Sequence, residues 1–136
     1  MNYRFEITDS DLILAKKNIW SDSSYANILA GNVGEIIACK YLNIDYNKTK
    51  QVRPDTGYDI YANNIKYQVK SVEDQPYKNK IYLERKDYNK NFDRYLLILI
   101  AQYYNFAEIL VDSDIKMIEN NCLYDEEYGK FYLKIK

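Results

Sequence analysis

Hydrophobic residues near the N-terminus recur at the spacing of helices. Asp9 or Ser10 can cap a first helix over roughly Asp11–Trp20. The turn at Ser21–Ser24 precedes a second apolar pattern, which predicts a helix over Tyr25–Leu42. The apolar positions of this second helix are Ile28, Leu29, Val33, Ile36 and Ile37.

A strand pattern follows in the middle of the chain. Asn43–Lys50 is polar with alternating apolar residues, which indicates a weak strand and a loop, and Pro54–Gly57 has the composition of a turn. Side chains then alternate over Tyr58–Ala62 and Ile65–Lys70. The two residues between these strands, Asn63–Asn64, tolerate the left-handed backbone that a type I′ turn requires. We therefore expect a β-hairpin here.

One continuously apolar run dominates the second half of the chain. Tyr95–Ala101 has the pattern of a strand that is buried on both faces. The other elements expected there are a polar connection over Ser71–Asn79, a strand at Ile81–Leu83, a charged helix or loop at Glu84–Asn91, a strand at Tyr103–Val111, a helix from Ser113 or Asp114 to Asn120, and an edge strand at Phe131–Lys136. With a length of 136 residues, this order predicts one α/β domain over residues 1–136, with a central mixed β-sheet flanked by helices.

Small residues form a second stripe on the predicted helix Tyr25–Leu42. The stripe consists of Gly31, Gly34 and Ala38, and Glu35 lies beside it. A glycine inside a helix costs about 1 kcal/mol relative to alanine. The usual reason to keep such glycines is the close approach of the helix backbone to another element. We therefore expect the stripe to touch a neighbouring element.

The composition narrows the available chemistry. Hydrophobic residues make up 47% and charged residues 29%, as in a globular protein, and the net charge of -1 neither indicates nor excludes a nucleic-acid binder. The chain has no histidine, which excludes Ser-His-Asp and Cys-His catalysis and histidine-bound zinc. With only two cysteines, zinc and iron–sulfur sites are not expected. Polar catalysis would need carboxylates, lysine, amides and a hard cation.

Two further features concern location and tyrosine content. The first residues lack the charged-then-apolar pattern of a signal peptide, and the longest apolar run is too short to cross a bilayer. Cys39 and Cys122 fit buried residues in a reducing compartment. We expect a soluble, intracellular protein with no membrane partner. The 16 tyrosines can indicate base stacking or the codon bias of an A/T-rich genome, and we favour codon bias.

The predicted hairpin register brings polar residues together. A two-residue turn pairs Tyr61 with Lys66 and Asp59 with Gln68, and alternation places Lys70 on the same face. The opposite face is apolar. Gly57 lies opposite Lys70 and leaves room beside it.

Such a group suits metal-assisted hydrolysis. Asp59 can give charge to a divalent cation, and the carbonyl oxygens of the Gln68 side chain and the Val69 backbone can complete an oxygen-only ligand set. This set favours Mg²⁺, with Mn²⁺ as a substitute. Lys70 can orient or deprotonate a water or neutralise a scissile phosphate. Glu35 is the obvious second carboxylate.

Three short motifs together resemble the PD-(D/E)XK nuclease superfamily. They are Gly31-Asn32-Val33-Gly34-Glu35, Pro54-Asp55-Thr56-Gly57-Tyr58-Asp59-Ile60 and Tyr67-Gln68-Val69-Lys70-Ser71. The resemblance covers roughly residues 25–72 and is to the branch that carries Gln-x-Lys in place of Glu-x-Lys. It implies a restriction-endonuclease-like fold.

The resemblance also implies roles for individual residues. It gives Asp59 as the metal-binding aspartate, Gln68 as the variant acidic position, Lys70 as the catalytic lysine and Glu35 as the helical glutamate. Asp55 directly follows Pro54, but the hairpin register and the Asp-Ile pattern both favour Asp59, and Asp55 fits a turn former. Glutamine at the variant position removes one negative charge, so metal binding depends more strongly on Glu35.

The function expected from these features is a Mg²⁺-dependent endonuclease acting on DNA, of the restriction type or resolving Holliday junctions. Basic residues surround the hairpin, which suits a polyanionic substrate. They are Lys48, Lys50, Arg53, Lys78, Lys80, Arg85, Lys86, Lys90 and Arg94. Cutting both strands of a duplex with one site per chain favours a homodimer.

Simpler interpretations stay open. Asp59 and Lys70 can form a salt bridge on an exposed sheet, and Glu35 and Gln68 can be ordinary polar residues of a helix and a strand. The basic residues equally fit a solvated, mixed surface. For the whole chain, the alternative is a catalytically silent nuclease-fold protein that binds nucleic acid or serves as a subunit of a larger complex.

Overall fold

The computed structural model describes residues 3–19, 25–49, 59–83 and 92–135. Its helices are α1 (Asp9–Lys17), α2 (Tyr25–Leu42), α3 (Tyr46–Thr49) and α5 (Ile115–Asn121). Its strands are β1 (Tyr3–Glu6), β2 (Ile60–Ala62), β3 (Ile65–Glu73), β4 (Lys80–Leu83), β5 (Arg94–Ile100), β6 (Phe106–Ser113), β7 (Leu123–Asp125) and β8 (Lys130–Lys134). The chain is therefore of the mixed α/β class, as the sequence predicts.

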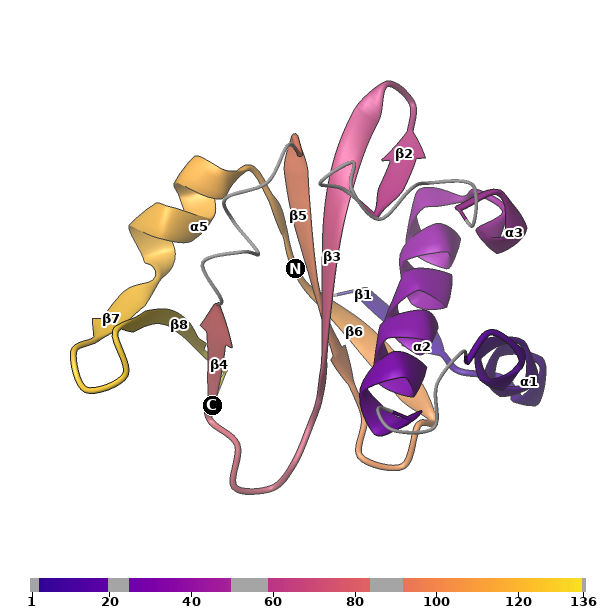
Figure 1. Cartoon of the computed structure of the whole chain (residues 1–136), viewed down its shortest axis with the longest axis horizontal. Coiled ribbons are helices and arrows are strands. Elements are labelled where there is room, and N and C mark those ends of the chain that lie inside the picture. The colour runs from indigo at the N-terminus through magenta and orange to yellow at the C-terminus, as the bar shows by residue number, and fades with distance from the viewer. Residues whose placement is uncertain (1–2, 20–24, 50–58, 84–91, 136) are drawn as a thin grey trace.

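The strands form two sheets. Five of them make a mixed sheet in the order β1-β6-β5-β3-β2, in which β3 and β5 are parallel and the other pairs are antiparallel. The helices α1, α2 and α3 lie on one side of this sheet (Figure 1). A second sheet, β4-β8-β7, lies on the other side together with α5 (Figure 1).

The second sheet corrects the expectation of one central sheet. The C-terminal segment expected to close that sheet is β8, and it pairs instead with β4 and β7. Helices α1, α2 and α3 lie on one face, and the other face is covered by this small sheet together with α5. The alternation of apolar and polar residues in a strand does not show which distant strand it pairs with. The C-terminal strand would have the same pattern in either sheet.

The helix α2 has the predicted bounds, but the start of α1 differs from the prediction. Thr8 caps α1, in place of Asp9 or Ser10. Its hydroxyl accepts a hydrogen bond from Asp11 N at 3.1 Å, and Asp11 Oδ2 accepts one from Thr8 N at 2.9 Å. This capping box satisfies two N-terminal N–H groups at once, which a cap at Asp9 or Ser10 would not do.

The predicted weak strand at Asn43–Lys50 is wrong. Asn43 has a φ of 58°, which ends α2, and Ile44 N donates to Cys39 O at 3.0 Å. The chain then forms the short helix α3, and Tyr46 is buried in the core beside α2. The alternating apolar residues of this segment suggested a strand, but packing against α2 makes it helical.

Two more differences concern the strands. The polar connection predicted over Ser71–Asn79 starts later, because β3 continues to Glu73 and pairs with β5 up to Ile100. The N-terminal strand β1 was not predicted, and it pairs with β6. The expected turns at Ser21–Ser24 and Pro54–Gly57 and the segment Glu84–Asn91 lie outside the described residues.

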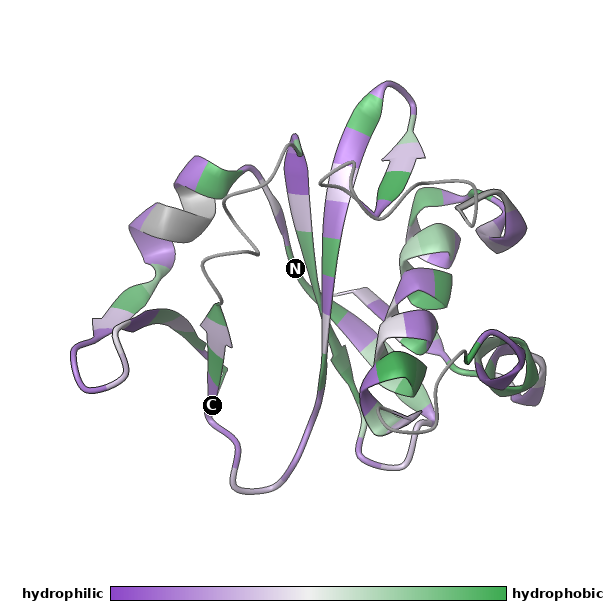
Figure 2. Ribbon diagram, in the orientation of Figure 1, coloured by the Kyte–Doolittle hydropathy of each residue, from purple (hydrophilic) through white to green (hydrophobic). Residues whose placement is uncertain are grey.

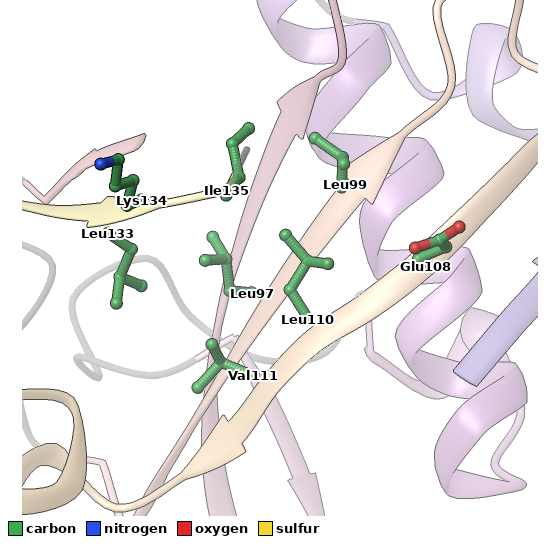
Figure 3. A pocket seen from close by; sticks show the side chains of 8 residues that line it. All are labelled: Leu97, Leu99, Glu108, Leu110, Val111, Leu133, Lys134 and Ile135. Carbon is green, nitrogen blue, oxygen red and sulfur yellow. The ribbon is translucent and has the colours of Figure 1, made fainter. Parts of the chain in front are cut away.

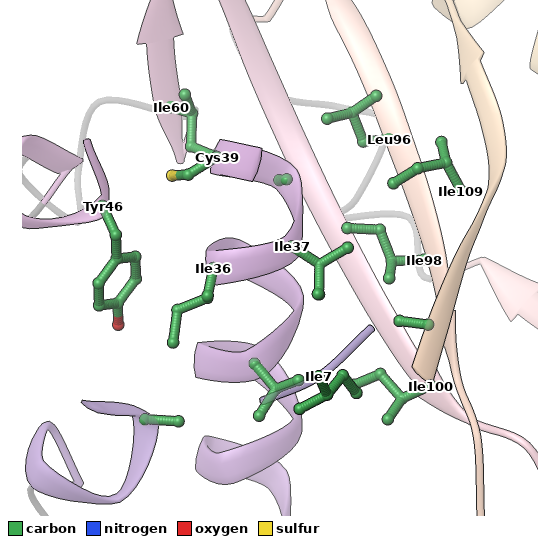
Figure 4. Packing of buried hydrophobic residues seen from close by; sticks show 14 of the residues in the cluster. Ile7, Ile36, Ile37, Cys39, Tyr46, Ile60, Leu96, Ile98, Ile100 and Ile109 are labelled. Carbon is green, nitrogen blue, oxygen red and sulfur yellow. The ribbon is translucent and has the colours of Figure 1, made fainter. Parts of the chain in front are cut away.

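The strand β5 divides the core into two clusters. Leu96, Ile98 and Ile100 point toward α2, whereas Tyr95 and Leu97 point toward the small sheet. Figure 4 shows the first cluster between α2 and the strands, and Figure 2 shows hydrophobic residues along β5 and in α2. The prediction that Tyr95–Ala101 is buried on both faces is confirmed.

The helix α2 meets β3 at Gly34. A Cβ built at Gly34 would lie 1.6 Å from Ser71 Oγ and 2.7 Å from Ser71 Cβ, so no larger residue fits there without a shift. A Cβ at Gly31 would meet no atom within 4 Å. The predicted close approach of the small-residue stripe is therefore centred on Gly34, and Gly31 does not take part in it.

This difference predicts opposite effects of alanine at the two glycines. Gly34→Ala should lower the free energy of unfolding by about 1–3 kcal/mol, because it overpacks the contact with Ser71. Gly31→Ala should raise it by about 0.5–1 kcal/mol, because alanine is the better helix former and has room. Urea denaturation followed by circular dichroism measures both. Ser71→Gly should restore part of the loss in the Gly34→Ala protein, and equal effects at both glycines would contradict the contact.

A buried carboxylate joins α1 to α2. Asp11 is 8% exposed and forms an ion pair with Lys40, whose ammonium also donates to Glu6 O at 3.3 Å. Burial acts to raise the pKa of Asp11, but hydrogen bonds from Lys40 and Thr8 outweigh it and hold the pKa below the ordinary value of 3.8. The ionised form is therefore favoured in the folded protein.

Asp11 should make stability depend on pH. A lowered folded-state pKa stabilises the fold above the ordinary carboxyl pKa, and this contribution is lost as the pH falls through the folded-state value. Asp11→Asn should cost about 1–3 kcal/mol at pH 7 and clearly less near pH 3. Urea denaturation at both pH values measures the difference. Asp9→Asn, an exposed control in the same helical turn, should have little effect, and an equal Asp11→Asn loss at both pH values would count against the ion pair.

Candidate functional site

The predicted hairpin is present, and from Ile60 to Tyr67 it has the predicted register. Asn63 and Asn64 have φ values of 53° and 65°, as a type I′ turn requires. The paired residues are Ile60 with Tyr67, Tyr61 with Lys66, and Ala62 with Ile65. Two asparagines that accept the left-handed backbone therefore set the position of every later residue in β3.

Asp59 lies where β2 begins, and its backbone leaves the regular ladder. In an antiparallel pair, hydrogen-bonded and non-hydrogen-bonded residue pairs alternate, and an Asp59–Gln68 pair would be a non-hydrogen-bonded one. The N–H of Asp59 would then point away from β3. Its N–H instead donates to Tyr67 O at 2.9 Å, and its Oδ2 accepts from Val69 N at 2.9 Å. The half-buried carboxylate thus lies at the edge of β3 against Val69, and it does not stand directly across from Gln68.

The Asp59 contact also exposes a backbone group. The N–H and C=O of one strand residue point to the same edge. The Val69 carbonyl therefore points to the edge on which Asp59 lies. A carboxylate and a backbone carbonyl share this short edge, which extends beyond the end of the three-residue strand β2.

Gln68 is the most unusual residue of the hairpin. It is 6% exposed, and its Oε1 has no hydrogen-bond partner within the described structure. Leaving a buried polar atom unpaired costs about 1–3 kcal/mol. Such an atom calls for an explanation, and a bound ion or water is the usual one.

Gln68 belongs to a buried polar row that the sequence analysis missed. Its register partner on β5 is Tyr95, and the partner of Tyr95 on β6 is Ser113. All three are buried, and Ser113 Oγ has no hydrogen-bond partner in the described part of the chain. Tyr95 gave a weak signal as the polar start of the apolar run, but Ser113 gave none.

Alternation along β3 separates the residues that face α2 from those that face the second core cluster. Val69 packs in the cluster beside α2 and Ser71 meets Gly34, so these residues face the helix. Gln68 and Lys70 therefore face the other way, as does Val72 in the second cluster. Glu35 is half-buried on α2. The structure thus brings Asp59, Gln68, Val69 and Lys70 together on one hairpin, and Glu35 lies on α2, the helix that packs against β3.

A second polar cluster lies near the hairpin on the face of α2. Asp112 accepts hydrogen bonds from Tyr41 Oη at 2.6 Å and Arg94 Nε at 2.7 Å. Burial and the bond to Asp112 raise the pKa of Tyr41 to about 12, so this phenol stays protonated. The cluster ties the end of α2 to β5 and β6, which is a structural role. Its members are too far apart in sequence for pattern analysis to find.

Two grooves lie close to the sheet. One, of about 760 Å³, runs between the first half of α2 and β3, and Gly31, Lys70 and Lys78 are among its lining residues. The other, of about 320 Å³, lies between the five-stranded sheet and β8 and is lined mainly by aliphatic side chains (Figure 3). Only the first groove touches a residue of the candidate site.

The donor set fits a hard cation that keeps most of its waters. Three oxygen donors belong to the hairpin: the Asp59 carboxylate, the unpaired Gln68 Oε1 and the Val69 carbonyl. Oxygen ligands of this kind suit Mg²⁺. Within residues 3–19, 25–49, 59–83 and 92–135, no three Asp, Glu or Cys side chains gather closely enough to hold a metal ion. Among these residues, such a site would therefore have fewer than three acidic ligands.

Comparison with known proteins adds no family. The chain matches no protein-family model and no curated protein. Among the described helices, none has both the length and the apolar character needed to cross a membrane.

The unpaired Gln68 Oε1 predicts a stabilising substitution. Gln68→Met replaces the amide by an apolar group of similar length, so it should raise the free energy of unfolding by about 1 kcal/mol. Gln102→Met, at an exposed turn position, should stay within about 0.5 kcal/mol of the wild type. Thermal and urea unfolding measure both. A clear loss of stability in Gln68→Met would mean that the amide serves the fold.

Proposed function

We propose that this chain is a metal-dependent endonuclease of restriction-endonuclease-like fold that hydrolyses phosphodiester bonds of DNA. The observation that carries the proposal is the buried Gln68 Oε1, which lacks a hydrogen-bond partner among the described residues. It lies next to the edge held by Asp59 and on the same face as Lys70. A stability cost at this place is understandable if the oxygen serves a ligand.

The arrangement of the sheet supports the finer fold assignment. A hairpin, β2–β3, is followed by a strand, β5, that is parallel to β3, and α2 packs on one face. Asp59, Gln68, Val69 and Lys70 all belong to this hairpin, which supports the family resemblance. The restriction-endonuclease-like fold is therefore part of the proposal.

Each residue of the hairpin has a separate task in this mechanism. Asp59 provides the negative charge, and its position is fixed by the hydrogen bond from Val69 N. Gln68 Oε1 and the Val69 carbonyl add neutral oxygen donors. A divalent cation held there would supply charge to the scissile phosphate and an activated water. The Lys70 ammonium neutralises the phosphate or orients the attacking water.

In this proposal, Glu35 has a smaller part than the resemblance implies. A carboxylate on α2 can approach the site only around the edge of β3, because Gln68 and Lys70 face away from the helix. Asp59 is then the main anionic group. We expect a cation requirement in the millimolar range, since Mg²⁺ sites with few carboxylates keep several waters.

One observation favours a second candidate function. The described residues hold no cluster of three acidic or cysteine ligands, as expected of a nuclease-fold protein that has lost catalysis and binds nucleic acid or joins a larger complex. In the active form, restriction-type and junction-resolving enzymes are both open. Cutting both strands of a duplex would require two copies of the chain.

Cleavage assays test the proposal. Labelled four-way junction, duplex and single-stranded DNA are incubated with Mg²⁺, Mn²⁺ or EDTA. Wild-type protein should cut in Mg²⁺ and not in EDTA. Asp59→Asn and Lys70→Ala should each reduce the rate about a hundredfold or more. The controls Asp45→Asn, an exposed aspartate, and Lys66→Ala, on the same face of β3, should change it little.

Gln68→Glu separates the two candidate functions. An active enzyme should keep its activity and need less Mg²⁺, because a second carboxylate joins the site. A catalytically silent protein should gain cleavage that the wild type lacks or stay inactive. If folded wild-type protein cuts no DNA or RNA with either cation, the enzyme assignment fails.

A further inference from the structure

The small sheet β4-β8-β7 has one apolar and one polar face. Ile81, Leu83 and Leu133 point into the second core cluster. Alternation therefore places Lys80, Tyr82, Tyr132 and Lys134 on the outer face. Figure 3 shows Leu133 and Lys134 on opposite sides of β8. The tyrosine–lysine face, as we call it, consists of Lys80, Tyr82, Tyr128, Lys130, Tyr132 and Lys134.

Three aromatic rings gather on this face. Tyr82 and Tyr132 are directly opposite in register, and their ring centroids are 5.7 Å apart. The ring of Tyr128, from the turn after β7, meets Tyr82 edge-on at 5.7 Å. Tyr128 is 63% exposed, so much of its ring is available to a ligand.

The central ring is held in place. Tyr82 Oη donates to Asp125 Oδ2 at 2.8 Å, and Asp125 also accepts from the backbone of Glu127 and Tyr128. This bond, with a smaller effect of burial, raises the pKa of Tyr82 to about 12. The phenol therefore stays neutral, and the turn that carries Tyr128 is tied to β4.

The lysines next to the rings repel one another. Lys80 lies directly opposite Lys134, and like charges at such positions destabilise a sheet. The Lys80 ammonium lies 4.6 Å from the centre of the Tyr132 ring. Lys130 is opposite Asp125 and partly balanced by it. An anion between Lys80 and Lys134 would relieve the repulsion.

We propose that the tyrosine–lysine face binds single-stranded nucleic acid, with bases stacked on Tyr128 and Tyr132 and phosphates near Lys80 and Lys134. Stacking on aromatic rings needs unpaired bases, and adjacent lysines then hold the backbone. A duplex would contact only the lysines. Glu126 and Glu127, in the same turn as Tyr128, repel phosphates and confine them to the lysine side.

This inference does not rest on the proposed nuclease activity, because stacking and phosphate binding need no cation. The test is fluorescence anisotropy in EDTA with labelled oligo(dT) of about 15 nucleotides and a duplex of the same length. Wild-type protein should bind the single strand more tightly. Tyr128→Ala should weaken that binding about fivefold or more, whereas Tyr128→Phe should retain it. Lys134→Ala should lower the salt dependence by about 0.7 in log–log slope.

Matched controls make the outcome decisive. Tyr103→Ala removes an even more exposed tyrosine, 83% accessible, from the turn between β5 and β6, and it should leave binding unchanged. Equal affinity for duplex, or no loss in Tyr128→Ala, would overturn the proposal. It would also be overturned if Tyr128→Ala altered the oligomeric state in gel filtration with no change in binding. Intact binding in a protein that cuts nothing would leave this inference standing and remove the nuclease proposal.

Discussion

The contact between Gly34 and Ser71 is the constraint on which the arrangement of this protein depends. It lets the backbone of α2 approach β3 so closely that a single methyl group would not fit. The distance between helix and sheet sets the depth of the core that Ile36, Ile37 and Leu96 fill. It also fixes which face of β3 is covered, and hence that Gln68 and Lys70 point away from the helix.

The local elements could be predicted because local residues decide them. Two asparagines set the hairpin turn, and an unbroken apolar run marks β5 as a strand buried on both faces. The sequence predictions were wrong where contacts with distant segments decide the local structure. Tyr46 packs on α2 in a short helix, and the C-terminal strand pairs with β4 in a second sheet. Neither choice leaves a trace in the spacing of apolar residues.

In the candidate site, too, the features set by local residues could be predicted and those set by distant contacts could not. The sequence placed Asp59, Gln68, Val69 and Lys70 on one hairpin, and the structure has them there. It could not give the turn of the Asp59 backbone that brings the carboxylate to Val69 N. It also could not reveal that Tyr95 and Ser113 continue the buried polar row from Gln68, since that row crosses three strands. The side of the sheet on which Glu35 lies depends on the packing of α2.

The pairing of β1 with β6 joins residues 3–6 to residues near 106–109. During synthesis, β1 has no partner until most of the chain has left the ribosome. A shorter delay applies to α2, because its apolar face packs against β3 and β5. The N-terminal helices must therefore wait with exposed apolar surface, and such waiting favours aggregation or chaperone binding.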